Sequence, residues 1–153
     1  MKVHVLYGTE SGNCELIAED LIEQLKESGC ETELNEIHEI EPGALTTDRL
    51  YVVVCSTHGD GEVPNVVKPF IDDFDSVLPD LSGVVYAMFG LGDRFYEATY
   101  SQGSEHIDRR FAGQGAKRIG EYGRHDASSW DDASEVALEW IEGVLQEAAS
   151  LTK

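Results

Sequence analysis

The sequence predicts an α/β domain with a three-layer α/β/α fold around a five-stranded parallel sheet of strand order 2-1-3-4-5. Apolar runs of strand length alternate with segments of helical periodicity, a pattern typical of parallel sheets covered by helices on both faces. Three of these runs are almost continuously apolar, as expected of strands buried on both faces, and each precedes a polar, glycine-rich loop. Right-handed crossovers leave few topologies, and this order places the three most apolar strands at the centre.

The first half of the chain predicts three strands and one long helix. Residues 2–7 form the first strand, and residues 15–27 form a helix with an apolar stripe that Gly29 ends. Residues 31–37 alternate between apolar and charged side chains and predict an edge strand. Residues 39–48 predict a loop with one short helical turn. Residues 50–55 carry the strongest strand signal and are expected at the sheet centre.

In the second half, Pro64 suits the first turn of a helix, whose expected apolar face comprises Val66, Val67, Phe70, Ile71 and Phe74. Residues 84–89 predict a strand, residues 90–97 a loop, and residues 101–113 a helix. Residues 117–122 predict a short strand and residues 123–129 a loop. An apolar stripe over residues 133–145 predicts the last helix. Without repeats or linkers, residues 1–153 are expected to form a single domain.

The net charge of the protein indicates which kinds of partner it can bind. Thirty acidic against eleven basic residues give a net charge of −19. Nucleic acid and anionic membranes require clustered lysine and arginine, so neither is expected as a partner. An acidic surface favours a basic protein partner, although solubility or adaptation to a saline habitat would produce the same composition.

The cysteines and the N-terminus indicate a reducing compartment. Cys14, Cys30 and Cys55 are widely spaced without a CxxC pair, which fits neither a disulfide framework nor a zinc or iron–sulfur site. No apolar signal core and no run of membrane-spanning length occurs, so we expect a cytoplasmic monomer. No set of residues has the spacing of a metal site or of a Ser-His-Asp triad, so no catalytic or metal residue is predicted.

Residues 9–13, Thr-Glu-Ser-Gly-Asn, connect the first strand to the first helix. The free N–H groups and the dipole of a helix N-terminus favour an anion there, and hydroxyl and amide side chains add donors. No lysine or arginine occurs between residues 3 and 25, so such a site would hold a phosphate by neutral donors. The stretch is neither a nucleotide P-loop nor a GxGxxG turn. On its own it fits equally well a helix N-cap at Ser11 or Asn13.

Three loops together resemble those of the flavodoxin family. Residues 7–13 resemble its phosphate loop, residues 56–62 its first flavin loop and residues 90–97 its second. The resemblance covers nearly the whole chain. It is nearest to the short-chain, MioC-like branch, which is related to the FMN domains of diflavin reductases. Flavodoxin is itself a standard example of a protein whose ligand binds beyond the C-terminal ends of the strands, where the winding direction of the sheet reverses. The expected position of the ligand is therefore carried over from the family.

The resemblance implies a noncovalently bound FMN. The residues expected to hold it are Thr9, Glu10, Ser11, Gly12, Asn13, Cys14, Ser56, Thr57, His58, Gly59, Asp60, Gly61, Leu91, Gly92, Asp93, Phe95, Tyr96 and Glu97. Tyr96 is the expected stacking ring, with Phe95 as the alternative. Two positions depart from the family pattern: Cys14 replaces a usual threonine, and His58 replaces a usual tyrosine or tryptophan. The smaller ring of His58 should bind the flavin less tightly.

The implied function is electron transfer rather than enzymatic catalysis. A flavodoxin would shuttle single electrons from a flavodoxin/ferredoxin reductase-type donor to redox acceptor proteins through its acidic surface. The alternative is an FMN-dependent reductase of a small molecule such as a quinone. A receiver-type signalling domain of the same topology requires acidic residues after the first and third strands. This chain has Gly8-Thr9 and Ser56-Thr57 at those positions, so a receiver domain is rejected.

Overall fold

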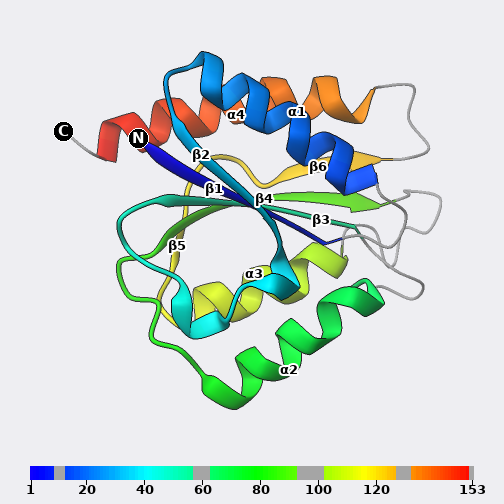
Figure 1. Ribbon diagram of the computed structural model, residues 1–153, viewed down its shortest axis with the longest axis vertical. Coiled ribbons are helices and arrows are strands. Elements are labelled where there is room, and N and C mark those ends of the chain that lie inside the picture. Colours follow the sequence, from blue (N-terminus) through cyan, green and yellow to red (C-terminus); the bar gives the residue numbers. More distant parts are fainter. Residues whose placement is uncertain (9–12, 57–62, 93–101, 127–131, 152–153) are drawn as a thin grey trace.

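The strands of the computed structural model form one parallel sheet (Figure 1). The structure describes residues 1–8, 13–56, 63–92, 102–126 and 132–151. The strands are β1 (Lys2–Gly8), β2 (Glu31–Glu36), β3 (Leu50–Ser56), β4 (Val85–Gly92), β5 (Lys117–Arg118) and β6 (Gly123–Asp126). They follow the order β2-β1-β3-β4-β5, and β6 also pairs with β4. The predicted strand order is therefore confirmed.

Helices cover both faces of the sheet (Figure 1). On one face lie α1 (Asn13–Glu27) and α4 (Ala133–Leu151), and on the other lie α2 (Lys68–Val77) and α3 (Gln102–Gly113). Three short 3₁₀ helices, η1 (Ile37–Glu39), η2 (Pro42–Ala44) and η3 (Asn65–Val67), lie in the connections around β3. None of the helices described combines the length and the apolar character needed to cross a membrane.

Alternation along the central strands divides the core into two parts. Val52 and Val54 of β3 pack with residues of α1 and α4, whereas Val53 and Cys55 pack with residues of α2 and α3. Each of these four side chains is fully buried. A strand buried on both faces needs apolar residues at successive positions, which explains the continuous apolar run in the sequence.

The C-terminal end of the first helix and the edge strand β2 follow the sequence prediction, whereas the helix begins at Asn13, two residues earlier than predicted. Gly29 adopts a left-handed conformation (φ +86°), and the Cys30 N–H donates to the Leu25 carbonyl at 3.0 Å, which closes α1. Among the described strands, β2 pairs only with β1, and its first four residues alternate between exposed and partly buried, as in an edge strand. The predicted stop at Gly29 and the predicted edge strand are both confirmed.

The fifth strand corrects two predicted boundaries. The predicted strand at 117–122 ends after Arg118, and residues 123–126, expected in a loop, form β6 beside β4. The sequence hides β6 because its residues are glycine and polar. Gly123 is required there, because a Cβ would overlap Phe89 and approach Trp140 to 2.9 Å.

Two further element boundaries differ from those predicted from the sequence. β4 continues through Gly92, so residues 90–92 belong to the strand and not to the predicted loop. Their pairing with β6 supplies the backbone hydrogen bonds that a loop would lack. Val66 lies in η3 before α2 and is 40% exposed, so the predicted apolar face begins at Val67.

Candidate functional site

The C-terminal ends of the three central strands lie side by side at one edge of the sheet. Gly8 of β1 pairs with Cys55 of β3, and Cys55 pairs with Gly90 of β4. The next pair along β3 and β4 is Ser56 with Leu91. β1 has β2 on one side and β3 on the other, so the winding direction reverses between β1 and β3. Ligands of doubly wound sheets bind beyond the strand ends at such a point.

β6 extends the same edge, and the sequence reasoning gave it no role. Leu91 pairs with His125, and Gly92 pairs with Asp126. His125 is partly exposed, so a titratable ring lies at the edge beside the end of β4. Arg124 and His125 lie within the predicted loop at residues 123–129, and hydrophobic periodicity cannot identify such polar residues as a strand.

Gly8 ends β1 where the chain cannot accept a side chain. A Cβ at Gly8 would overlap Val67 Cγ2 of η3 and lie 3.4 Å from Ile37 Cγ2. The chain after β3 therefore packs directly against the last residue of β1. The contact between Gly8 and Val67 joins the end of β1 to the segment that follows β3, so it lies where the winding direction of the sheet reverses.

The N-terminus of α1 follows β1 at this edge. The helix begins at Asn13, so the N–H groups of its first turn, which have no acceptor within the helix itself, lie within a few residues of Gly8. The Cys14 side chain is fully buried in the core between the sheet, α1 and α4, so this residue can offer an anion only its backbone N–H. The first turn contains the acidic Glu15 and no basic residue. Neutral donors at a helix N-terminus suit a phosphate ester, and the phosphate loop at residues 9–12 stays a prediction.

Several carboxylates lie near Tyr7 at the C-terminal end of β1. The pKa of Tyr7 is raised above its ordinary value, first by burial and then by the charges of Glu15, Glu36 and Glu39. The pKa of the Cys55 thiol is raised well above its ordinary value by complete burial, with a smaller contribution from Cys14. A buried, protonated thiol is a poor nucleophile, so Cys55 serves as a core residue.

The structure describes five of the predicted site residues, and all five belong to elements that meet at this edge. Asn13 and Cys14 begin α1, Ser56 ends β3, and Leu91 and Gly92 end β4. The other predicted residues lie outside the described residues: Thr9, Glu10, Ser11, Gly12, Thr57, His58, Gly59, Asp60, Gly61, Asp93, Phe95, Tyr96 and Glu97. They remain predictions from the sequence.

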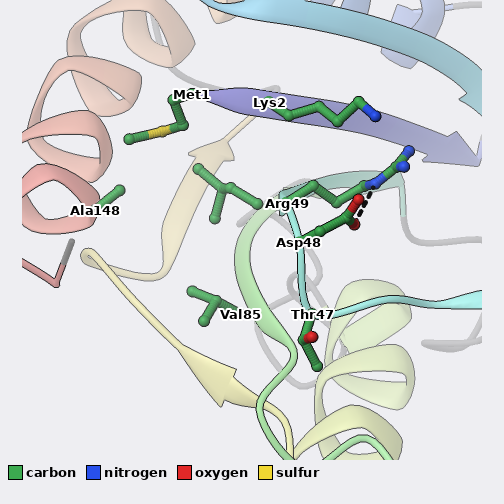
Figure 2. Close-up of a pocket in the computed structure, with 8 residues that line it drawn as sticks. Met1, Lys2, Thr47, Asp48, Arg49, Val85 and Ala148 are labelled. Atoms are coloured by element: carbon green, nitrogen blue, oxygen red, sulfur yellow. Dashed lines mark hydrogen bonds and ion pairs between the residues drawn. The ribbon is translucent and has the colours of Figure 1, made fainter.

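A surface pocket of about 420 Å³ lies at the opposite edge, where β1, β3 and β4 begin (Figure 2). Lys2, Arg49 and Val85 line it together with Ala148 of α4. Arg49 donates to Asp48 at 3.1 Å and to Glu33 at 3.1 Å, so its guanidinium is already engaged by carboxylates. This pocket is separate from the site at the strand C-termini.

Comparison with known proteins agrees with the arrangement of the strands and of α1. A family model for flavodoxin matches residues 5–140. The chain is 30% identical over 146 residues to the MioC homologue of Haemophilus influenzae, covering 95% of this chain and 98% of that protein. It is 34% identical over 146 residues to the sulfite reductase (NADPH) flavoprotein alpha-component of Bacillus subtilis, with 95% of this chain covered, but it spans only 23% of that longer protein.

Solved structures show the same fold over the whole chain. A short-chain flavodoxin associated with a non-canonical PDU bacterial microcompartment superposes with a TM-score of 0.80 at 28% identity, covering 97% of this chain and 99% of that one. A flavodoxin variant from Pseudomonas aeruginosa superposes with a TM-score of 0.79 at 28% identity, covering both chains completely. The chain therefore belongs to the flavodoxin family, whose members bind FMN and transfer electrons.

Proposed function

We propose that this protein is an electron carrier that takes single electrons from a flavodoxin/ferredoxin reductase-type donor and delivers them to acceptor proteins. The observation that carries the proposal is the junction of β1, β3 and β4 with the N-terminus of α1 at one sheet edge, where the winding reverses. FMN supplies the redox chemistry, and the protein contributes binding, orientation and electrostatics.

The proposed roles of the site residues follow from the resemblance of the three loops to those of the flavodoxin family. The backbone N–H groups at the start of α1, with Thr9, Ser11 and Asn13, would hold the terminal phosphate through neutral donors. Tyr96 would stack on the flavin ring, and His58 would contact it less extensively. The negative charge around β1 would disfavour adding an electron to the bound flavin and so lower its reduction potential.

The acidic composition supports a basic docking partner. With a net charge of −19, the protein would attract a basic surface over a range set by ionic strength. At about 0.15 M salt the Debye length is about 8 Å, so the attraction should weaken steeply near physiological ionic strength. Electron transfer that depends on electrostatic docking would slow accordingly.

The test is a reconstituted chain of electron transfer. FMN-loaded protein is mixed with NADPH, a flavodoxin/ferredoxin reductase and a basic haem protein as acceptor, and haem reduction is followed by absorbance. We expect reduction that requires all components and slows as salt rises from about 0.01 to 0.3 M. Rapid reduction of a quinone by the loaded protein, without transfer to the haem acceptor, would favour the small-molecule reductase instead.

A further inference from the structure

A groove runs along α4, away from the C-terminal edge of the sheet. It has a volume of about 520 Å³ and lies between α4 and the segment that joins β5 to β6. The segment contributes Gly120 and Glu121, and α4 contributes Glu139, Trp140, Gly143 and Glu147 among others. We call it the α4 groove.

Hydrogen bonds hold the two walls of the α4 groove together. The Trp140 indole N–H donates to the Glu121 carbonyl at 2.7 Å, and the Gly120 N–H donates to the Glu147 carboxylate. The Trp140 ring also packs against Phe89 of β4, with 5.2 Å between the ring centroids. These contacts connect both walls to the sheet, so the groove is a formed feature of the fold.

Gly143 lines the α4 groove between Glu139 and Glu147 of the same helix. It lies in the interior of α4, where glycine disfavours the helix relative to alanine. Its conformation does not demand glycine, and no neighbouring atom lies within 4 Å of the position of an added Cβ. The space beside Gly143 is therefore open, and only a side chain larger than a methyl group would fill it.

The groove is negatively charged along its length. Glu139, Gly143 and Glu147 follow one another at four-residue spacing, which puts the two carboxylates on one stripe of the helix about 12 Å apart. Glu121 adds a third carboxylic acid residue from the facing segment. None of the ion pairs between residues in the described ranges involves these three glutamates. Trp140 is partly exposed between Glu121 and Glu139 in this lining.

We propose that the α4 groove binds an extended basic segment of a partner protein, with arginine or lysine residues four positions apart. One cation would lie against Trp140 and pair with Glu139, because an indole is the ring that binds cations best. Four residues of extended chain cover about 13 Å, so the second cation reaches Glu147. The net charge of −19 favours such a partner. The site requires no flavin, so its test stands apart from that of electron transfer.

The experiment titrates the FMN-loaded, ¹⁵N-labelled protein with the peptide acetyl-Arg-Ser-Gly-Ser-Arg-amide and follows NMR spectra. We expect saturable shifts at the Trp140 indole N–H and the Gly143 amide, with the Trp140 signal assigned from a Trp140→Phe variant. The same peptide with citrulline in place of both arginines keeps the shape and removes the charge. It should bind at least tenfold more weakly.

Two matched pairs of variants test the groove itself. Gly143→Leu should fill it and weaken binding at least tenfold, whereas Gly143→Ala should keep binding within about threefold; a thermal midpoint no lower than that of the parent shows that both are folded. Glu139→Gln should weaken binding about two- to fivefold. Glu142→Gln makes the same charge change on an exposed α4 residue outside the lining and should change binding less than twofold.

Some results would overturn the proposal. Shifts that spread over the acidic surface without saturating at Trp140 and Gly143 would show nonspecific attraction. Equal effects of Glu139→Gln and Glu142→Gln, or undiminished binding by a folded Gly143→Leu variant, would also show that the peptide does not bind in the α4 groove. Because binding is measured directly, these results are independent of whether the protein passes electrons.

Discussion

Gly8 at the end of β1 lies so close to Val67 of η3 that the methyl group of an alanine would overlap the valine side chain. We therefore expect Gly8→Ala to lower the free energy of unfolding by about 1–3 kcal/mol, the usual cost of overpacking. Urea denaturation measures it. Gly43→Ala is the control, because its added methyl group would meet no atom within 4 Å and should change stability by less than about 0.5 kcal/mol.

A double variant checks the cause. If the overlap with Val67 is responsible, Gly8→Ala with Val67→Ala should destabilise less than the sum of the two single changes, because the shortened side chain leaves room for the methyl group. Strictly additive losses would show that another feature of Gly8 carries the cost.

The ion pair between Asp75 of α2 and Arg110 of α3 predicts a dependence of stability on acid pH. The Arg110 guanidinium donates to both oxygens of Asp75, at 2.8 and 3.0 Å, and lowers the pKa of that carboxyl below its ordinary 3.8. Since the folded-state pKa is lower than the unfolded one, the stabilisation is complete above about pH 4 and disappears as the pH falls through the folded-state value.

Asp75→Asn should therefore cost about 0.2–1 kcal/mol at pH 7, a range set by the exposure of the pair. The difference from the parent should shrink as the pH falls from about 4 towards 2. Thermal unfolding at a series of pH values measures it. Asp72→Asn changes an exposed aspartate on the same helix and serves as the control. A difference that stays constant across this range would mean that the pair does not stabilise the fold.

Flavin selectivity tests the phosphate site at the start of α1. Titration of the apoprotein should give tight binding of FMN and much weaker binding of riboflavin and FAD. Thr9→Ala and Ser11→Ala should each weaken FMN by roughly 1–3 kcal/mol, the cost of one lost buried hydrogen bond, and leave riboflavin unchanged. Ser28→Ala, at the far end of the same helix, should affect neither ligand. Equal affinity for FMN and riboflavin would remove the phosphate argument.

The two proposed ring contacts should differ in strength. Tyr96→Ala should cost more FMN affinity than His58→Ala, because tyrosine buries a larger ring and stacking adds on the order of 0.5–1.5 kcal/mol beyond buried area. Tyr96→Phe, which keeps the ring, should retain most of the affinity. Fluorescence titration of each apoprotein variant measures these values. A larger loss from the histidine change would reverse the assignment of the two residues.

The predicted elements succeeded where burial leaves a pattern in the sequence. β3 is apolar at successive positions because helices cover both faces of the sheet there, so its apolar run could be recognised as a strand in the sequence. The sequence prediction missed β6 for the opposite reason. The polar side chains of Arg124 and His125 are partly or fully exposed while the backbone pairs with β4. Hydrogen bonds of the backbone carry no side-chain signature, so such a strand is seen only in the folded sheet.

By itself, the sequence determined the alternation of strands and helices, the strand order, the family and the neutral character of the predicted phosphate loop, because these depend on local periodicity and on residue types. Only the tertiary structure decided that Gly8 must lack a side chain and that an open groove lies beside Gly143. Each of these depends on which atoms approach from distant parts of the chain, and close packing, unlike periodicity, is a property of the assembled fold.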